Sequence, residues 1–388
     1  MRQVYLDHAA TTPIHSEVAA EISQFLETCF GNPSSVHAFG REAKKHLENA
    51  RQKVALLIGA LSEEIIFTSG GTEADNLAIL GTAFAYQGRG NHVITSAVEH
   101  HAVLDTCKFL GQNGYEVTFL PVDQNGVVNP EDVARAIRRE TILISIMHAN
   151  NEIGTIEPIE EIGRIARERE VAFHTDAVQT VGHLPINVED LKVDLLSMAA
   201  HKMYGPKGAG ALYVRRGTRL APIHHGGGQE RKRRPGTENL PGIVGFGKAA
   251  EVAARDLSSQ SARIQQLRDK LIQGIQKRVP DVRLNGHPTR RLPNNVNFSF
   301  AGVEGESLLL SLDLKGIAAS TGSACSSGAF QASHVLAAIG LPPELARGSL
   351  RMTTGLANSD EDIDYVLEVL PQIVAKLRTL SPLARKQG

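Results

Sequence analysis

Lys202 is the residue of this chain whose neighbours most favour covalent chemistry. It follows an apolar run at residues 193–197, typical of a strand, and precedes a glycine-rich turn and a second apolar run at 211–214. Burial or a neighbouring cation can lower the pKa of such a lysine, and a neutral amine can form a Schiff base with an aldehyde. A hairpin turn that leaves Lys202 in solvent explains the same stretch equally well.

A second candidate for chemistry is the turn at residues 69–76, in which Gly70 and Gly71 stand among hydroxyl side chains. A strand is expected before it, at 64–68, and a helix after it. Backbone N–H groups are unpaired at a helix start and the helix dipole is positive there, so the turn favours an anion such as phosphate. An ordinary capped turn is the alternative. The turn matches neither the G-x-G-x-x-G nor the Walker A pattern.

Polar side chains gather where three further expected strands end. These strands occupy residues 92–96, 141–147 and 171–175, and the polar residues after them include His100, Asn151, Asp176 and Gln179. In an open α/β sheet, side chains that follow the strands point into the ligand crevice. Each residue by itself is more often structural than functional, and their grouping is what favours a site.

Cys325 lies within a stretch of small residues, 320–328. A thiol on such a polar loop is expected to be exposed, and an exposed thiol is retained chiefly where it reacts. An inert cysteine is expected among buried apolar side chains instead. Arg351, which follows an apolar pair, predicts either an ion pair or a fork for a carboxylate.

Several classes of protein are excluded by composition. The net charge is −1, which gives no field for nucleic acid or a membrane surface, and four basic residues at 231–234 are weak evidence on their own. No apolar run approaches the roughly 18 residues of a membrane helix, and residues 1–13 lack the core of a signal peptide. Three scattered cysteines favour a reducing compartment, with the cytoplasm as default. The pair His224 and His225 lacks partners for a zinc site.

The expected elements alternate between strand and helix up to about residue 214. Alternation of this kind predicts a doubly wound α/β sheet whose ligand crevice lies at the strand carboxyl ends. At 388 residues the chain is long enough for about two domains. A helix expected at 243–275 leads into an α+β region that begins near residue 294.

Together these groups are the parts that a pyridoxal phosphate site requires. The aldehyde needs Lys202, the phosphate needs the turn at Gly71 and Thr72, and the ring nitrogen needs an anion, which Asp176 would supply. His100 would stack on the ring. The protein in such a site tunes and orients a cofactor that performs the carbanion chemistry.

At this point the sequence resembles the class V, fold-type I pyridoxal phosphate enzymes, and among them the NifS/IscS-type cysteine desulfurases. The matching stretches span most of the chain, at residues 5–12, 31–35, 68–76, 99–100, 150–154, 176–179, 201–202, 235–239 and 322–325.

The resemblance implies a role for each site residue. Lys202 forms the Schiff base and moves protons, and Cys325 takes sulfur from the cysteine adduct as a persulfide, releasing alanine. His100 stacks on the ring and acts as acid or base. The other cofactor contacts are Gly71, Thr72 and His201 to the phosphate, Asp176 to the ring nitrogen, Gln179 to the ring hydroxyl, Asn151, and Thr237 from a second subunit. Substrate contacts are Asn151, Arg351 and Asn32.

The resemblance also implies the architecture and the partners. A large domain, residues 15–257, carries a mainly parallel seven-stranded sheet, and a small α+β domain combines residues 1–14 with 258–388 and carries the Cys325 loop. The family is homodimeric, acts on L-cysteine, and passes sulfur to an acceptor protein such as an iron–sulfur scaffold; no metal is expected, and the cytoplasm is the expected compartment. Nucleic acid enters only through tRNA-thiolation partners, and no membrane is involved.

Three departures from the family pattern qualify these expectations. The family usually has serine where this chain has Ala199, so cofactor retention is expected to be weaker and Ala199→Ser to slow cofactor loss on dialysis. After Arg351 the usual Ser-Leu-Gly is replaced by residues 353–355, Thr-Thr-Gly. The tail that docks a scaffold in many members is short, which leaves the acceptor open.

Other classes of protein remain as alternatives. An aminotransferase or selenocysteine lyase shares the cofactor site, and Cys325 argues against the aminotransferase. A non-catalytic sulfur relay with a decayed site is disfavoured by the joint presence of Lys202, Asp176, His100 and Cys325. A nicotinamide-dependent dehydrogenase lacks its glycine fingerprint and ribose-binding acid.

Overall fold

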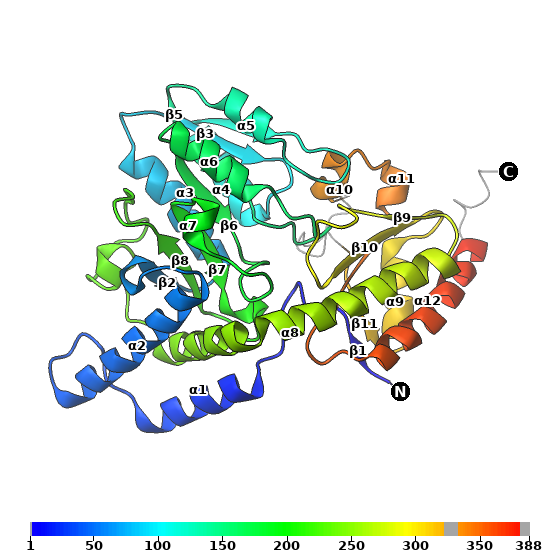
Figure 1. Cartoon of the computed structure of the whole chain (residues 1–388), viewed down its shortest axis with the longest axis horizontal. Coiled ribbons are helices and arrows are strands. Elements are labelled where there is room, and N and C mark those ends of the chain that lie inside the picture. Colours follow the sequence, from blue (N-terminus) through cyan, green and yellow to red (C-terminus); the bar gives the residue numbers. More distant parts are fainter. Residues whose placement is uncertain (1, 322–332, 381–388) are drawn as a thin grey trace.

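A computed structural model describes residues 2–321 and 333–380 of the chain, and its main element is a seven-stranded sheet (Figure 1). The strand order across the sheet is β2-β8-β7-β6-β5-β3-β4. The strands are β2 (Ile65–Thr68), β3 (His92–Ser96), β4 (Glu116–Leu120), β5 (Thr141–Ser145), β6 (Ala172–Asp176), β7 (Leu195–Ala199) and β8 (Gly210–Val214).

Most neighbours in this sheet are parallel. Only β8 runs antiparallel to the strands beside it, β2 and β7, so β2 and β7 end at the same edge as β3, β5 and β6. The predicted fold class, an α/β sheet that is mainly parallel and seven-stranded, is therefore confirmed. The central strands are buried throughout, as expected where helices cover both faces of a parallel sheet.

Two groups of helices cover the two faces of the sheet. On one face lie α3 (Gly71–Ala85) and α4 (His101–Gln112), whose apolar side chains pack with Ile66, Val93 and Leu195. On the other face Phe173 and Leu196 pack with a larger set. This set comprises α1 (Ser16–Thr28), α2 (Ala38–Leu57), α5 (Pro130–Ala136), α6 (Ile159–Glu168), α7 (Val188–Leu191) and the first part of α8 (Leu240–Arg278).

A second hydrophobic core lies beside the first. It is built on a three-stranded antiparallel sheet, and its elements are β9 (Val282–Leu284), β10 (Asn295–Phe300), β12 (Ser349–Thr353), α9 (Gly305–Asp313) and α12 (Asp360–Leu380). Two short parallel strands, β1 (Val4–Tyr5) and β11 (Ile317–Ala318), join the N-terminal segment to this core. The remaining short helices are α10 (His334–Ala338) and α11 (Pro343–Ala346).

Helix α8, 39 residues long, takes part in both cores (Figure 1). Most of its buried side chains from Leu240 to Ala253 belong to the first core, and the apolar ones from Leu267 to Ile275 belong to the second. The division expected after residue 257 falls between these two buried segments, where several side chains are exposed. The domain boundaries themselves stay a prediction.

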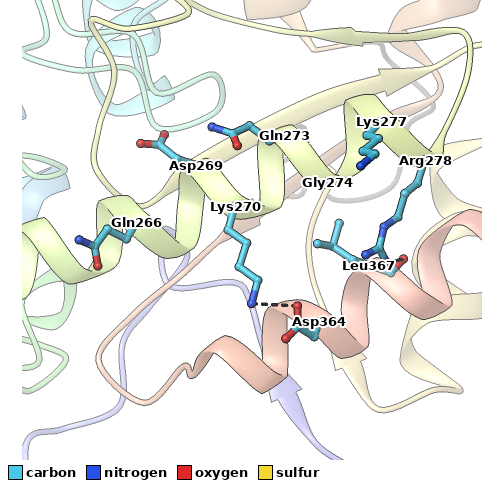
Figure 2. Close-up of a pocket in the computed structure, with 9 residues that line it drawn as sticks. All are labelled: Gln266, Asp269, Lys270, Gln273, Gly274, Lys277, Arg278, Asp364 and Leu367. Atoms are coloured by element: carbon cyan, nitrogen blue, oxygen red, sulfur yellow. Dashed lines mark hydrogen bonds and ion pairs between the residues drawn. The ribbon is translucent and has the colours of Figure 1, made fainter.

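Helices α8 and α12 approach each other closely in the second core (Figure 2). A Cβ atom on Gly274 would lie 2.4 Å from a methyl carbon of Leu367, so glycine permits this approach. The ion pair between Lys270 and Asp364 (2.8 Å) spans the same contact. None of the helices in residues 2–321 and 333–380 is long and apolar enough to cross a membrane.

Candidate active site

The N-terminal segment crosses the edge of the large sheet where the parallel strands end. The backbone N–H and side-chain hydroxyl of Thr12 both donate to the carbonyl of His201, at 3.0 and 2.9 Å. The side-chain amide of Gln179 donates to the carbonyl of Ala9 (3.2 Å). Residues 9–12 thus lie against the residues that follow β6 and β7. The sequence matched this stretch to a family but predicted no role for it.

Lys202 lies under this segment, on a short turn after β7. The β7–β8 connection is an antiparallel hairpin, but the side chain of Lys202 is half-buried. Its ammonium group donates to the carbonyl of Ala10 (2.8 Å) and to the carbonyl of Ala9. The hairpin alternative was thus right about the backbone and wrong in placing the lysine in solvent.

Asp176 and His100 approach Lys202 from the ends of β6 and β3, which lie on either side of β5 in the sheet. Asp176 closes β6, is 6% exposed, and accepts a hydrogen bond from the backbone of Val178 (2.9 Å). Burial raises its pKa, while His100 and Lys202 act to lower it. The structure therefore brings together three residues that the sequence predicted separately, one acid between two groups that can carry positive charge.

His100 is the N-cap residue of α4, and this role orients its ring. Its Nδ1 accepts a hydrogen bond from the backbone of Ala102 (3.1 Å), so in the neutral ring the proton sits on Nε2. Burial lowers the pKa of His100 most, Lys202 lowers it further, and Asp176 raises it. The neutral imidazole is therefore the favoured form, and it presents an N–H donor away from its own helix.

The anion turn lies next to Asp176. A Cβ atom on Gly71 would meet a methyl carbon of Val178 at 2.7 Å, so glycine lets the turn approach the residues that follow β6. Helix α3 begins at Gly71, and no side chain of the described residues caps its first turn. Its first N–H groups are therefore available to an anion.

His201 lies on the short turn after β7, directly before Lys202. Its Nδ1 lies 3.2 Å from the hydroxyl of Thr11, and burial, followed by Lys202 and Lys207, lowers its pKa to about 4. It is therefore a neutral ring at neutral pH. Ala199, where the family usually has serine, is buried at the end of β7.

Arg351 and Asn151 meet on the side of the crevice nearest the second core. Arg351 is 5% exposed. Its guanidinium donates to the carbonyl of Asn151 (3.0 Å) and to the carboxylate of Asp7 (2.9 Å). Its Nε is buried and has no hydrogen-bond partner among the described residues. Of the two predicted alternatives, the ion pair is present. Its partner Asp7 was not predicted, because nothing in its spacing distinguishes it from a surface acid.

A buried polar chain behind Asp176 was also missed. The ring of His174 lies between the hydroxyls of Ser145 (2.8 Å from Nδ1) and Ser197 (2.9 Å from Nε2), and Asp75 is 3.6 Å from Nε2. His174 and Asp176 are alternate residues of β6, and Ser197 pairs in register with Asp176, so these side chains share the face covered by α3. The signal was present: polar residues at every second position of otherwise buried strands.

For three predicted site residues, Asn32, Thr237 and Cys325, the described residues show no place beside Lys202. Asn32 is exposed on the α1–α2 connection, where its side chain accepts a hydrogen bond from Ser34 (2.9 Å), and Thr237 is exposed before α8. Neither hydrogen bonds to another predicted site residue within the described ranges. Cys325 lies outside the described residues. The roles of all three stay predictions.

The residues present fit pyridoxal phosphate. A half-buried amine would meet the aldehyde, unpaired N–H groups at the start of α3 would meet the phosphate, and a buried acid between two potential cations would meet the ring nitrogen. The described residues hold no group of three or more histidine, cysteine or acidic side chains arranged for a metal ion.

Comparisons with known proteins agree with this geometry. The model of the aminotransferase class-V family matches residues 4–366. The chain is similar to the cysteine desulfurase IscS of Dictyoglomus turgidum, 59% identical over 381 residues that cover 98% of this chain and 97% of the relative. That of Methanosarcina thermophila is 55% identical over 386 residues, covering 100% and 95%. Among solved structures, a NifS-like protein superposes with a TM-score of 0.91 and 39% identity, covering 97% of this chain and 100% of that one.

Proposed function

Because the chain belongs to the aminotransferase class-V family and is a pyridoxal-phosphate-dependent cysteine desulfurase, we propose that the residues gathered around Lys202 are its working groups. The observation that carries this assignment is the meeting of Lys202, Asp176 and His100 at one sheet edge, beside an uncapped helix start. When bound there, the cofactor supplies an electrophilic carbon and an electron sink for a carbanion.

Lys202 and His100 are proposed to hold and move protons. The ammonium group of Lys202 is held by two backbone carbonyls of the N-terminal segment, which fixes where its nitrogen lies. His100 presents Nε2–H, and because burial lowers its pKa the neutral ring would donate a hydrogen bond from that atom. Asp176 would supply the anion that pairs with the ring nitrogen, and Gln179 would meet the ring hydroxyl.

The phosphate is proposed to bind at Gly71 and Thr72, with His201 beside it. The N–H groups of the first turn of α3 and the positive end of the helix dipole both favour a dianion. His201, uncharged at neutral pH, would serve as a hydrogen-bond donor rather than a cation. Thr237 would reach the phosphate of a second subunit.

Arg351 and Asn151 are proposed to bind the substrate, with Asn32 as a further contact. An arginine fork suits a carboxylate, and the buried Nε of Arg351 leaves one donor for it. The carboxylate of cysteine would compete with Asp7 for the same guanidinium. Substrate binding is then an exchange of one anion for another, which avoids leaving a buried cation unpaired.

Cys325 is proposed to receive the sulfur. Its thiolate attacks the sulfur of the substrate, an S–S bond forms, and the C–S bond breaks with its electron pair staying on the carbon. That carbon takes up a proton and leaves as alanine, and the enzyme keeps a persulfide. The sulfur then passes to an acceptor protein, for which an iron–sulfur scaffold is the proposed class.

The chain is further proposed to act as a homodimer in the cytoplasm. Large apolar side chains are exposed on and near the α1–α2 connection, namely Leu26, Phe30, Val36 and Phe39, at 60% or more of their surface. Exposed apolar clusters of this kind mark association sites.

The wild type and two variants test the proposal. Protein from cells supplied with vitamin B6 should show the visible absorbance of a lysine-bound cofactor and should release alanine and sulfide from cysteine with a reductant. Lys202→Ala should abolish the absorbance band. Cys325→Ser should keep the band and lose sulfide release. A colourless wild-type protein would refute the assignment, and sulfide release by Cys325→Ser would refute the role of the thiol.

A further inference from the structure

Three consecutive residues before α8 have left-handed backbone conformations. The φ angles of Glu230, Arg231 and Lys232 are 41°, 57° and 64°. Side chains other than glycine rarely adopt this region, and a run of three persists only where the surroundings hold it in place. The turn therefore requires a strong anchor.

That anchor is a buried ion pair between Glu230 and Arg51. Two hydrogen bonds of 2.7 Å join the carboxylate to the guanidinium, and the two side chains are 2% and 3% exposed. Glu230 also accepts from the backbone N–H of Phe67 (2.8 Å), and Arg51 donates to the carbonyl of Ile65 (2.9 Å). Both backbone groups lie on the open edge of β2, the strand that leads into the anion turn. The turn at 230–232 is thus fastened to that strand.

The residues after the turn are fastened as well. Arg234 forms an ion pair with Glu73 in the first turn of α3 (2.8 Å). Part of the basic run at 231–234 is therefore paired within the chain and is not a solvated patch. Gly236 donates its N–H to the side chain of Gln229 (3.0 Å), which closes the loop, and Asn239 caps α8 by accepting from Gly242 (3.3 Å).

Thr237 is left between these fixed points. It is exposed, and no hydrogen bond to its side chain is made by residues 2–321 or 333–380. A short segment held at both ends, with one outward hydroxyl, is arranged to present that hydroxyl to something outside the chain.

We propose that Glu230 and Arg51 are positioning residues of the desulfurase: their buried pair holds the left-handed turn so that Thr237 reaches the cofactor phosphate of the partner subunit. The inference rests on the proposed homodimer and on the proposed role of Thr237. It adds that this pair and Arg234 are tied to β2 and to Glu73 of α3, the strand and helix that flank the chain's own phosphate turn, so the two cofactor sites of a dimer would share parts.

The first test measures cofactor affinity in three variants. Thr237→Ala and Glu230→Gln should each raise the dissociation constant of pyridoxal phosphate from the apoprotein about tenfold, as for the loss of one hydrogen bond to a charged group. The double variant should be no weaker than either alone, because both changes remove one contact. Additive effects, or an unchanged constant in a folded Glu230→Gln dimer, would overturn the inference.

The second test locates the effect in the dimer. In mixed dimers where one subunit carries Lys202→Ala, only the other subunit gives the lysine-bound absorbance band. When Glu230→Gln is placed on the Lys202→Ala subunit, the band should be lost faster on dialysis. When Glu230→Gln is placed on the subunit that keeps Lys202, the rate of loss should equal that of the mixed dimer without Glu230→Gln. The reverse pattern would mean that Glu230 acts on its own site through β2, and would refute the proposal.

Controls separate this inference from the proposed function. Arg255→Gln removes an exposed ion pair to Glu17 (2.8 Å) and should leave cofactor affinity unchanged. If Glu230→Gln does not fold, Arg234→Gln replaces it and should weaken affinity about threefold. No change in a folded Arg234→Gln dimer would overturn the inference. A colourless or monomeric wild type would refute the proposed function itself, whereas a coloured dimer insensitive to these changes would refute only the positioning role.

Discussion

Arg351 of β12 and Asp7 of the N-terminal segment form an ion pair of 2.9 Å that joins the second core to the crevice of the large sheet. The arginine is almost fully buried and the aspartate is one-fifth exposed. The carboxylate of Asp7 therefore occupies a donor that the substrate carboxylate would need.

Asp7→Asn should lower the free energy of unfolding, and a carboxylate ligand should stabilise this variant more than it stabilises the wild type. Removing one partner leaves a buried cation unpaired, which costs on the order of 3 kcal/mol. The product alanine should then raise the melting temperature more in the variant than in the wild type, because its carboxylate restores the missing anion. An equal shift in both proteins would contradict the exchange of anions.

Asp75→Asn should leave the cofactor absorbance nearly unchanged, whereas Asp176→Asn should alter it and slow turnover about a hundredfold. Burial and the charge of Asp176 raise the pKa of Asp75 well above its usual value, and Glu99 raises it further, although a hydrogen bond with Ser197 opposes the shift. Asp176 faces His100 and Lys202 instead. We therefore expect Asp75 to hold a proton and Asp176 the charge. Equal spectral changes in both variants would show that Asp75 carries charge as well.

Glu152→Gln should flatten the pH dependence of stability. Burial raises the pKa of Glu152 to about 7, against an ordinary value of 4.5, although a hydrogen bond from Ser333 opposes the shift. The stability that this group contributes is fully present below about pH 4.5 and is lost as the pH rises through about 7, by at most roughly 3 kcal/mol.

Urea unfolding of Glu152→Gln and wild type at several pH values measures this difference in slope. Glu131→Gln, a change at an exposed residue of α5, is the control and should leave the slope unchanged. Parallel curves for wild type and Glu152→Gln between pH 5 and pH 8 would contradict the expectation.

Gly274→Ala should destabilise the protein by about 1–3 kcal/mol, because the new methyl group overlaps Leu367 where α8 meets α12. Gly111→Ala in α4 is the matched control. A Cβ atom there meets nothing within 4 Å, so the higher helix propensity of alanine should stabilise by up to about 1 kcal/mol. Urea midpoints measure both, and a stabilised Gly274→Ala would contradict the close approach.

The large sheet could be predicted because its strands are short apolar runs between amphipathic helices. The bounds of β3 agree with the expected range 92–96 to the residue, and the other expected elements differ by one to three residues. Strand-end polar residues such as Asp176 and His100 were found by the same reasoning, since parallel strands end at one edge.

Contacts between distant segments could not be predicted. The crossing of the crevice by residues 9–12 depends on backbone carbonyls, which carry no side-chain signal. The pairs of Arg51 with Glu230 and of Arg351 with Asp7 join residues 179 and 344 positions apart, and either partner alone resembles a surface charge. The left-handed turn at 230–232 contains no glycine that would have indicated it.

Helix α8 contributes buried side chains to both cores along one unbroken rod. Unfolding of either core would remove the apolar contacts of one half of α8 while the other half stayed packed. Unfolding of one core should therefore destabilise the other. Lys202 follows β7 of the first core and Arg351 lies on β12 of the second, so we expect heating to unfold the surroundings of both residues together.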